Sequence, residues 1–210
     1  NDAFIPANTG LFTMDIWSVA DSAGQGTTIT YTDTTTKMSF VTDYVYGKDY
    51  NTPNGSWQLS RSTGGFEVSS TYDIYADETL YSVDAHIADY SIVGSVVYAI
   101  LYEEDLTGGD PIPLDQSDDY TITPADLGAW INIDFLSSQS LIAGTGYRIA
   151  IGSYIHPTDS VGVDMSGLGD YSSQGLFDKD DHYVNGAPTW YTISDIPMLR
   201  MNFDPTTVSS

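Results

Sequence analysis

The sequence predicts an all-β protein, an antiparallel β-sandwich of jelly-roll type with at most one or two short helical turns. Three observations lead to this fold class. Short runs in which apolar and polar residues alternate recur along the 210 residues, and a period of two is typical of strands. Gly, Asp, Asn, Ser and Pro separate the runs, as they do at turns. No segment keeps a helical period, and many short strands with almost no helix favour a sandwich.

Each predicted strand directs one face to the core and the other outward. In chain order the strands are "TTITYT" (27–32), "MSFVTDYVY" (38–46), "YSVDAHI" (81–87), "SVVYAILYE" (95–103), "WINIDF" (130–135), "YRIAIGSY" (147–154), "VGVDM" (161–165) and "MLRMNF" (198–203). The inward side chains of four strands are Met38, Phe40, Tyr44 and Tyr46, then Tyr81, Val83, Ala85 and Ile87, then Ile131, Ile133 and Phe135, and finally Leu199, Met201 and Phe203. The run 95–103 is apolar on both faces, which is typical of a central strand.

One helical turn is predicted in "TPADLG", which begins at Thr123. Thr123 suits the N-cap, Pro124 the first helical position, and Asp126 the place of a capping-box acid. Gly128 would end the turn. The segment "GTG" at 144–146 precedes a strand rather than a helix, so it indicates a hairpin turn and not a nucleotide-binding loop.

Size and composition predict a single domain over residues 1–204, with 1–63 as candidates for extra N-terminal strands. Hydrophobic residues make up 41% of the chain, which is enough for a substantial core. Residues 205–210 are expected to be a tail or the start of a linker. We therefore expect the chain to be part of a larger polypeptide or assembly.

The charge of the chain excludes several classes of partner. Its formal net charge is −23, from 29 acidic residues against six basic ones, and nucleic-acid binding needs a basic footprint. The chain has no cysteine, so it has neither a disulfide framework nor a Cys-ligated zinc site. No apolar run approaches 18 residues, so we expect no membrane insertion.

A series of segments between about residues 64 and 203 carries a family resemblance. In order they are "GGFEV", "LYSVDAHI", "GSVVYAILYEED", "DQSDDYTITPADLGAWINIDF", "LIAGTGYRIAIGSY" and "PMLRMNF". Trp130 to Phe135 fit a strand of pattern W-x-x-h-x-F, in which h is a hydrophobic residue. The next strand of the series follows the segment from Ala143 to Tyr147. The series resembles jelly-roll modules of large bacterial cell-surface and secreted proteins, including those exported with a C-terminal sorting domain. Such modules are similar in build to carbohydrate-binding modules. The resemblance implies an extracellular location at the bacterial cell surface and supplies no catalytic or binding residue.

Two acidic clusters are candidates for calcium. In "FDKDDHYVNG" the candidate ligands are Asp178, Asp180 and Asp181, and in "YEEDLTGGD" they are Glu103, Glu104 and Asp105. The first segment lacks the Gly and Glu that an EF-hand loop requires at its sixth and twelfth positions. The alternative is a solvated connection in which "NG" forms a tight turn. The three histidines are far apart and show no zinc-binding spacing,.

Aromatic residues near turns are candidates for binding a sugar ring, because rings stack on the apolar faces of sugars. These candidates are Trp130, Trp57, Trp190 and Tyr191. Trp130 falls on the outward parity of its strand, whereas the alternative for Trp57 and Trp190 is that they cover the ends of the core.

Three functions follow, in decreasing order of support. The first is a non-enzymatic module for adhesion or surface assembly, with a glycan or another cell-surface protein as its partner. The second is a carbohydrate-binding module with an aromatic platform on one sheet face or loop rim. The third is a glycan-active enzyme, which would need two facing carboxylates in a cleft. With 29 acids the sequence cannot select such a pair.

Overall fold

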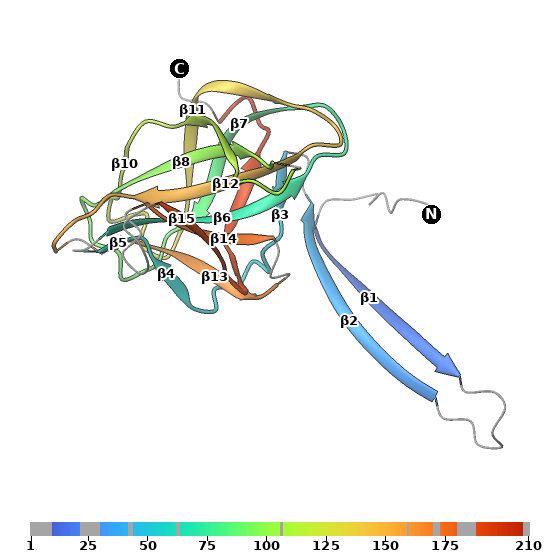
Figure 1. Cartoon of the computed structure of the whole chain (residues 1–210). Helices are drawn as coiled ribbons and strands as arrows, with labels where there is room; N and C mark the ends of the chain where they lie inside the picture. The colour runs from blue at the N-terminus through green and yellow to red at the C-terminus, as the bar shows by residue number, and fades with distance from the viewer. Residues whose placement is uncertain are drawn as a thin grey trace.

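A computed structural model of the chain describes residues 10–21, 30–41, 44–61, 64–105, 107–158, 160–169, 173–179 and 188–207. For 10–21, 30–41 and residue 61 it describes the backbone alone. These residues form only strands, turns and loops, and the sheets are antiparallel and pack together as a sandwich (Figure 1). Within the described ranges no helix is present that could cross a membrane. The predicted all-β sandwich is therefore confirmed.

One layer is a six-stranded sheet with the order β1-β2-β3-β17-β7-β11. Its strands are β1 (Gly10–Asp21), β2 (Thr30–Val41), β3 (Val45–Gly47), β17 (Leu199–Asn202), β7 (Glu78–His86) and β11 (Trp130–Leu141). The hairpin β1–β2 extends away from the sandwich in Figure 1. It joins the sheet through two residues of β2, because Phe40 pairs with Gly47 and Val41 pairs with Tyr46.

The other layer is an eight-stranded sheet with the path β10-β8-β12-β6-β14-β15, to which β9 adds beside β8 and β5 beside β6. The path strands are β10 (Tyr120–Thr121), β8 (Val96–Glu103), β12 (Gly146–Ser153), β6 (Gly64–Asp73), β14 (Gln174–Asp178) and β15 (Thr189–Thr192). The added strands are β5 (Ser60–Arg61) and β9 (Ile112–Gln116). The edge strand β9 contains Pro113, which cannot donate to a further strand and so protects this edge.

A smaller sheet continues the first layer. Its order is β16-β13-β4, with β16 (Asp195–Pro197), β13 (Gly162–Leu168) and β4 (Ser56–Gln58). A bridge between Ile87 and Val163 connects β13 to the end of β7.

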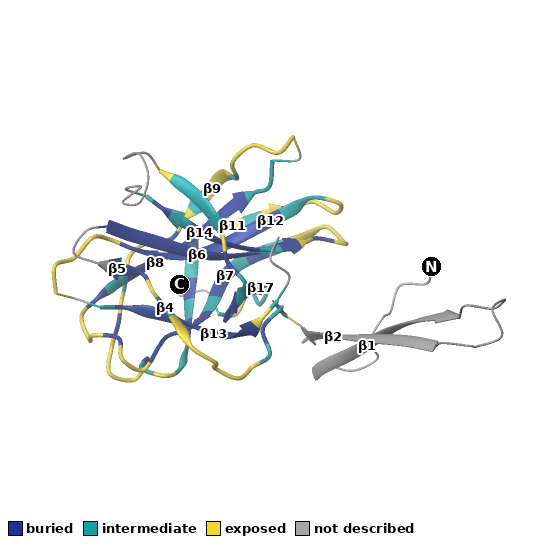
Figure 2. Cartoon of the chain, turned by 60° about the horizontal axis from the view of Figure 1, so that its bottom comes forward, coloured by how far each residue is buried: buried dark blue, intermediate teal, exposed yellow. Residues whose placement is uncertain are grey.

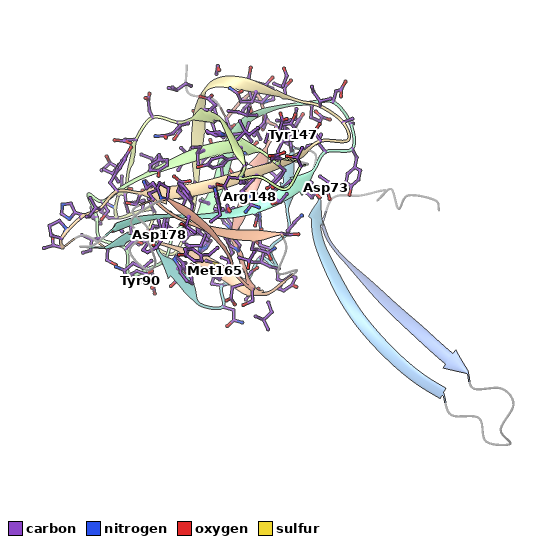
Figure 3. The ribbon with its side chains drawn as sticks, in the orientation of Figure 1. Asp73, Tyr90, Tyr147, Arg148, Met165 and Asp178 are labelled. Carbon is purple, nitrogen blue, oxygen red and sulfur yellow. The ribbon has the colours of Figure 1, made fainter. Side chains whose placement is uncertain are left out.

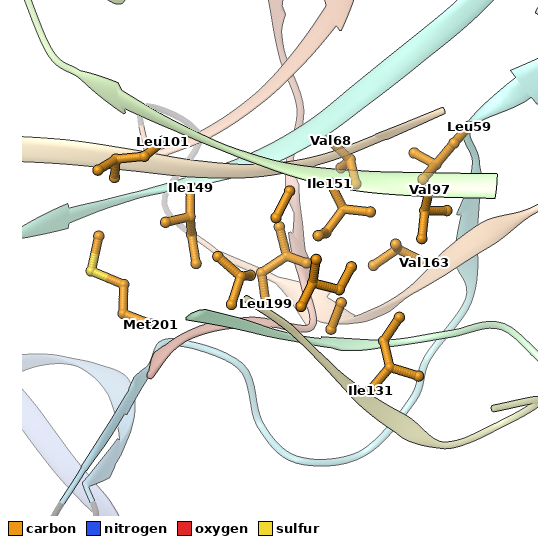
Figure 4. Packing of buried hydrophobic residues seen from close by; sticks show 14 of the residues in the cluster. Leu59, Val68, Val97, Leu101, Ile131, Ile149, Ile151, Val163, Leu199 and Met201 are labelled. Carbon is orange, nitrogen blue, oxygen red and sulfur yellow. The ribbon is translucent and has the colours of Figure 1, made fainter. Parts of the chain in front are cut away.

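The core lies between the two layers. Val97, Leu101, Ile149 and Ile151 face it from the eight-stranded sheet, and Ile131, Leu199 and Met201 face it from the other (Figure 4). Val83 and Ile133 of that second sheet belong to the same core. A buried tyrosine also ties the layers together, since the Tyr72 hydroxyl donates to the carbonyl oxygen of Leu199 at 2.6 Å. Both faces of β8 are buried, as the sequence predicted for 95–103 (Figure 2).

Two strand predictions need correction. Residues 38–46 are not one strand, because β2 ends at Val41 and β3 runs back antiparallel to it from Val45. Tyr81 is half-buried rather than inward, and fully buried Leu80 takes the inward place. The cause is a bulge, since the register between β7 and β11 shifts between Asp134 and Gln139,.

Two turn predictions also need correction. The capping-box contact forms, because the backbone N–H and hydroxyl of Thr123 both donate to Asp126 Oδ2, at 2.7 and 2.8 Å. No helix follows there, because Gly128 adopts a φ of 67° and its N–H bonds to the carbonyl oxygen of Ile87. The turn around Gly144 is not a hairpin, because it carries the chain from β11 in one sheet to β12 in the other.

Candidate functional site

The outer face of the eight-stranded sheet carries an unusual layer of aromatic and charged side chains. Alternation along β8 places Val97, Ala99 and Leu101 in the core, so Tyr98 and Tyr102 project from the opposite face,. These outward rings are nevertheless buried. Other side chains on the same face must therefore cover them.

The strand register aligns five of these positions in one cross-strand row. Gly152 of β12 pairs with Tyr98 of β8 and with Glu67 of β6. Phe177 of β14 pairs with Glu67 and with Trp190 of β15. We call Tyr98, Gly152, Glu67, Phe177 and Trp190 the aromatic row. It crosses the five strands from β8 to β15.

Glu67 is the polar centre of this row. It is only 3% exposed, and its two carboxylate oxygens accept hydrogen bonds of 2.6 Å from the hydroxyls of Tyr98 and Tyr102. Tyr98 reaches Glu67 by lying across β12, which is possible because Gly152 has no side chain; a Cβ there would collide with both residues. Burial, and then the negative charge of Glu67, raise the pKa of both tyrosines, so both remain donors.

Lys179 and Tyr154 extend the network at the Tyr98 end. The Lys179 ammonium donates to the Tyr98 hydroxyl and to the carbonyl oxygen of Ser153. It also lies 4.7 Å from the centre of the Tyr98 ring and 5.0 Å from that of Tyr154, distances at which a cation is attracted to an aromatic face. Tyr154 is 43% exposed.

Arg148 occupies the middle of the face, as Figure 3 shows. Its Nε donates to Glu104 Oε1 at 2.6 Å, and its Nη1 donates to Ser69 Oγ at 2.9 Å. The Thr71 hydroxyl donates to the same Glu104 oxygen at 2.9 Å. The guanidinium also lies 4.9 Å from the Trp190 ring centre. Arg148 thus fixes the position of the tryptophan.

Trp190 and Phe177 form the partly exposed surface of the layer. Their rings stack with centres 4.8 Å apart and planes inclined by 27°, and the Tyr102 ring is nearly perpendicular to that of Trp190, with centres 5.3 Å apart. Both stacked residues are half-buried. A preordered, partly exposed ring pair suits stacking against the apolar face of a sugar ring. Glu67 lies buried beneath this surface, with each carboxylate oxygen bonded to a tyrosine hydroxyl.

The outer face of the six-stranded sheet is polar in a different way. Arg200 forms two bonds of 2.7 Å with the carboxylate of buried Asp49, and its guanidinium lies 3.9 Å from the ring centre of Trp130. Beside it, Asp84 accepts a bond of 2.6 Å from Asn132, and burial raises the pKa of this carboxyl. These groups bond to one another, so this face functions as a structural network.

A buried imidazole–carboxylate pair adjoins that network. His86 Nδ1 lies 2.8 Å from Asp164 Oδ2, and the His86 ring meets Trp130 edge-on at 5.3 Å. Burial raises the pKa of Asp164, which the bond to His86 partly offsets.

The four aromatic candidates from the sequence do not come together. Trp190 lies in the aromatic row, whereas Tyr191, one residue along, packs against the core. Trp57 also packs against the core, and its buried indole N–H has no hydrogen-bond partner among the described residues. Trp130 lies on the outer face of the opposite sheet.

The acidic candidates have separate environments. Asp178 is fully buried and points to the opposite face from Phe177. Glu104 is bound by Arg148, and Asp105 Oδ1 accepts bonds from the backbone N–H and the hydroxyl of Thr107. These bonds hold the pKa of Asp105 below its usual value. Glu103 is half-buried at the end of β8.

No group of three or more acidic or histidine side chains in the described part of the chain is arranged to hold a metal ion. Asp180 and Asp181 lie outside the described residues, as does the predicted "NG" turn. Calcium binding by the segment 177–186 therefore stays a prediction.

Sequence reasoning missed most of the aromatic layer. One available signal was the tyrosine pair at the outward positions of β8, which the prediction treated only as evidence for a central strand. A second signal was the scarcity of basic residues, because the chain has six and two of them, Arg148 and Lys179, lie on this face. The contribution of Gly152 could not be foreseen, since it depends on the register of three strands.

The comparisons with known proteins give no identification: no protein-family model matches the chain, and no curated protein matches it.

Proposed function

We propose that the chain is a non-enzymatic, extracellular module of a bacterial cell-surface protein, which serves adhesion or surface assembly by binding a neutral glycan. The observation that carries this proposal is the stacked, partly exposed pair of Trp190 and Phe177 on the outer face of the eight-stranded sheet. Arg148 and Tyr102 hold the pair in place from beneath, so its rings are ordered before a ligand arrives,.

The charge of the chain favours a neutral ligand. An overall charge of −23 repels anionic polymers, and the side chains of Arg148 and Lys179 are engaged with protein groups. The proposal of a non-enzymatic role rests on the carboxylates of this face. Glu67 is buried between two tyrosines and Glu104 is bound by Arg148, so neither is placed as the acid or nucleophile of glycoside hydrolysis.

The test is a glycan array followed by calorimetry on the best neutral oligosaccharide. Trp190→Ala should weaken binding about tenfold or more, as expected when a central aromatic anchor is lost. Tyr75→Ala is the matched control, because Tyr75 is 82% exposed and lies in the connection between β6 and β7 rather than in a strand of this face. The glycan proposal would be contradicted if the protein bound no polysaccharide even at high protein concentration. It would also be contradicted if Trp190→Ala bound the oligosaccharide with unchanged affinity.

A further inference from the structure

The hairpin of β1 and β2 forms an arm that leaves the sandwich (Figure 1). Its strands pair along all twelve residues of each without a register shift. The arm joins the six-stranded sheet through two residue pairs between β2 and β3. An isolated two-stranded hairpin is marginally stable in water, whereas three or more strands with an apolar face are stable. The arm therefore gains stability from a strand that adds to it.

The outer edge of β1 is open to such a strand. β1 stands at the end of its sheet, and the described residues place no strand beyond it. It runs for twelve residues, which span about 40 Å at about 3.4 Å per residue,. Its sequence, GLFTMDIWSVAD, contains no proline, so every residue keeps its backbone N–H as a donor. A long, open edge of this kind is a template for pairing with another chain.

The other edges of the described sheets are short or interrupted. β11, at the far end of the same sheet, carries the bulge between Asp134 and Gln139. β9 contains Pro113, and β10, β15, β16 and β4 have between two and four residues. Proteins use these devices to prevent edge-to-edge association. Because β1 has none of them, it is the edge of this fold that is suited to association.

Charge favours a second copy of the chain as the partner on this edge. Two copies of net charge −23 repel each other,. The paired strands of the arm contain Asp15, Asp21 and Asp33 and one base, Lys37, so they carry 1 − 3 = −2 of this charge. The arm also extends away from the sandwich (Figure 1). Contact through the arms therefore joins two weakly charged segments and keeps the acidic sandwiches apart.

We propose that β1 pairs antiparallel with β1 of a second copy of this chain, so that two arms form one four-stranded sheet. Such a dimer has a two-fold axis through one pair of equivalent residues. Two centres use nearly the whole strand, Asp15 and Ile16. A centre at Asp15 places two carboxylates opposite each other, which is destabilising. A centre at Ile16 places Asp15 opposite Trp17 of the second copy, so the inferred register is centred on Ile16.

The size of the contact sets the affinity that we expect. An edge about 40 Å long on a sheet about 10 Å thick buries about 400 Å² per copy. The total of about 800 Å² is below the range of about 1,200–2,000 Å² for stable complexes, so the dimer should be weak and depend on concentration. This inference goes beyond glycan binding and does not depend on it.

The first experiment measures the mass of the full chain by sedimentation equilibrium. Concentrations run from about 1 µM to about 1 mM, the range in which a contact below the standard size associates. The buffer contains about 0.5 M NaCl, which screens the repulsion between sandwiches. We expect a monomer–dimer equilibrium. A chain that stays monomeric over the whole range overturns the inference and leaves the edge to a strand of a different protein.

A cysteine probe tests the register. The chain has no cysteine, so Ile16→Cys introduces a single thiol, and in the proposed dimer it lies opposite its own equivalent. Opposite Cα atoms in antiparallel strands are about 4.5–5.5 Å apart, a distance that a disulfide spans. Thr35→Cys is the matched control, because Thr35 pairs with Ile16 on β2, away from the open edge. Oxidation by dissolved oxygen should link Ile16→Cys into dimers several times faster than Thr35→Cys. Equal rates would overturn the register.

A charge probe separates dimer contact from loss of the arm. Ile16→Lys places two like charges at the two-fold axis and should weaken association about fivefold or more, whereas Thr35→Lys should have little effect. An equimolar mixture of Ile16→Lys and Ile16→Glu should associate more strongly than either variant alone. If the mixture gains nothing, Ile16 does not face its equivalent and the inference is wrong. None of these results bears on the glycan proposal, which Trp190→Ala tests separately.

Discussion

Replacing Glu67 with leucine tests whether the aromatic layer is held by its buried carboxylate. The change removes the acceptor of two hydrogen bonds of 2.6 Å, from Tyr98 and Tyr102. Hydrogen bonds to a charged group contribute about 1.5–3 kcal/mol each, so Glu67→Leu should lower the free energy of unfolding by about 3–6 kcal/mol. In a chain of this length each kcal/mol shifts the melting temperature by about 2–4 °C. The expected loss is therefore about 6–24 °C.

A combined variant separates lost hydrogen bonds from lost packing. In Glu67→Leu/Tyr98→Phe/Tyr102→Phe both donors are removed together with the acceptor, and no buried hydroxyl is left unpaired. Removing a buried acceptor together with its donors can be nearly neutral. Tyr98→Phe also takes one acceptor from Lys179, which keeps the carbonyl oxygen of Ser153, so the triple variant should recover most, but not all, of the stability lost in Glu67→Leu. Tyr154→Phe is the control, because its hydroxyl bonds to Asp119 on the exposed side of the molecule.

The assay is equilibrium unfolding in urea, followed by circular dichroism, with the coupling energy taken from the single and combined variants. Two results would refute the argument. One is a loss below about 1 kcal/mol in Glu67→Leu, since the carboxylate would then not be a buried acceptor. The other is a triple variant no more stable than Glu67→Leu, because the loss would then come from packing.

Three further predictions concern stability. Burial raises the pKa of Asp84 and Asp164 above 3.8, so as the pH falls the folded protein takes up these protons at a higher pH than the unfolded chain does. Protonation therefore stabilises the fold, and the melting temperature should be higher at about pH 4.5 than at about pH 7. The difference should be smaller in Asp84→Asn. Asp49→Ala leaves the Arg200 guanidinium buried without its carboxylate and should cost about 3–5 kcal/mol in urea unfolding, whereas a cost under 1 kcal/mol would mean that the pair does not form. Calcium at about 1 mM should raise the melting temperature more than NaCl of equal ionic strength if Asp178 and its neighbours bind the ion, and EDTA should remove the gain.

The strand pattern of the sandwich could be predicted because burial on one face imposes a period of two. Ile131 and Ile133 were assigned inward from alternation alone, and both are buried in the core. The same rule failed where the chain reverses, because alternation continues in the sequence from Phe40 to Tyr46 while the structure folds it into two strands. The inward assignment of Tyr81 was wrong for a related reason. A bulge changes which residues of a strand face the core, and the alternating sequence pattern does not reveal where a bulge lies.

The candidate site was less predictable, because it depends on which strands become neighbours. Sequence spacing placed Trp190 and Tyr191 together, but adjacent strand residues point to opposite faces. The true neighbours of Trp190 are Phe177, thirteen positions earlier, and Arg148, which is further still. Their association follows from the order β12-β6-β14-β15, which no local pattern encodes.

The placement of basic residues explains why the two outer faces differ. Arg200 on the six-stranded sheet is enclosed by Asp49 and Trp130, so the ring that it contacts is part of a structural network. Arg148 on the eight-stranded sheet lies beneath Trp190 instead, with Glu104 as its counterion, and supports a ring that stays partly exposed. Neither cation is directed at solvent. Recognition on the eight-stranded face, as we propose it, therefore depends on ring stacking and hydroxyl contacts, which suit a neutral sugar in a chain of net charge −23,.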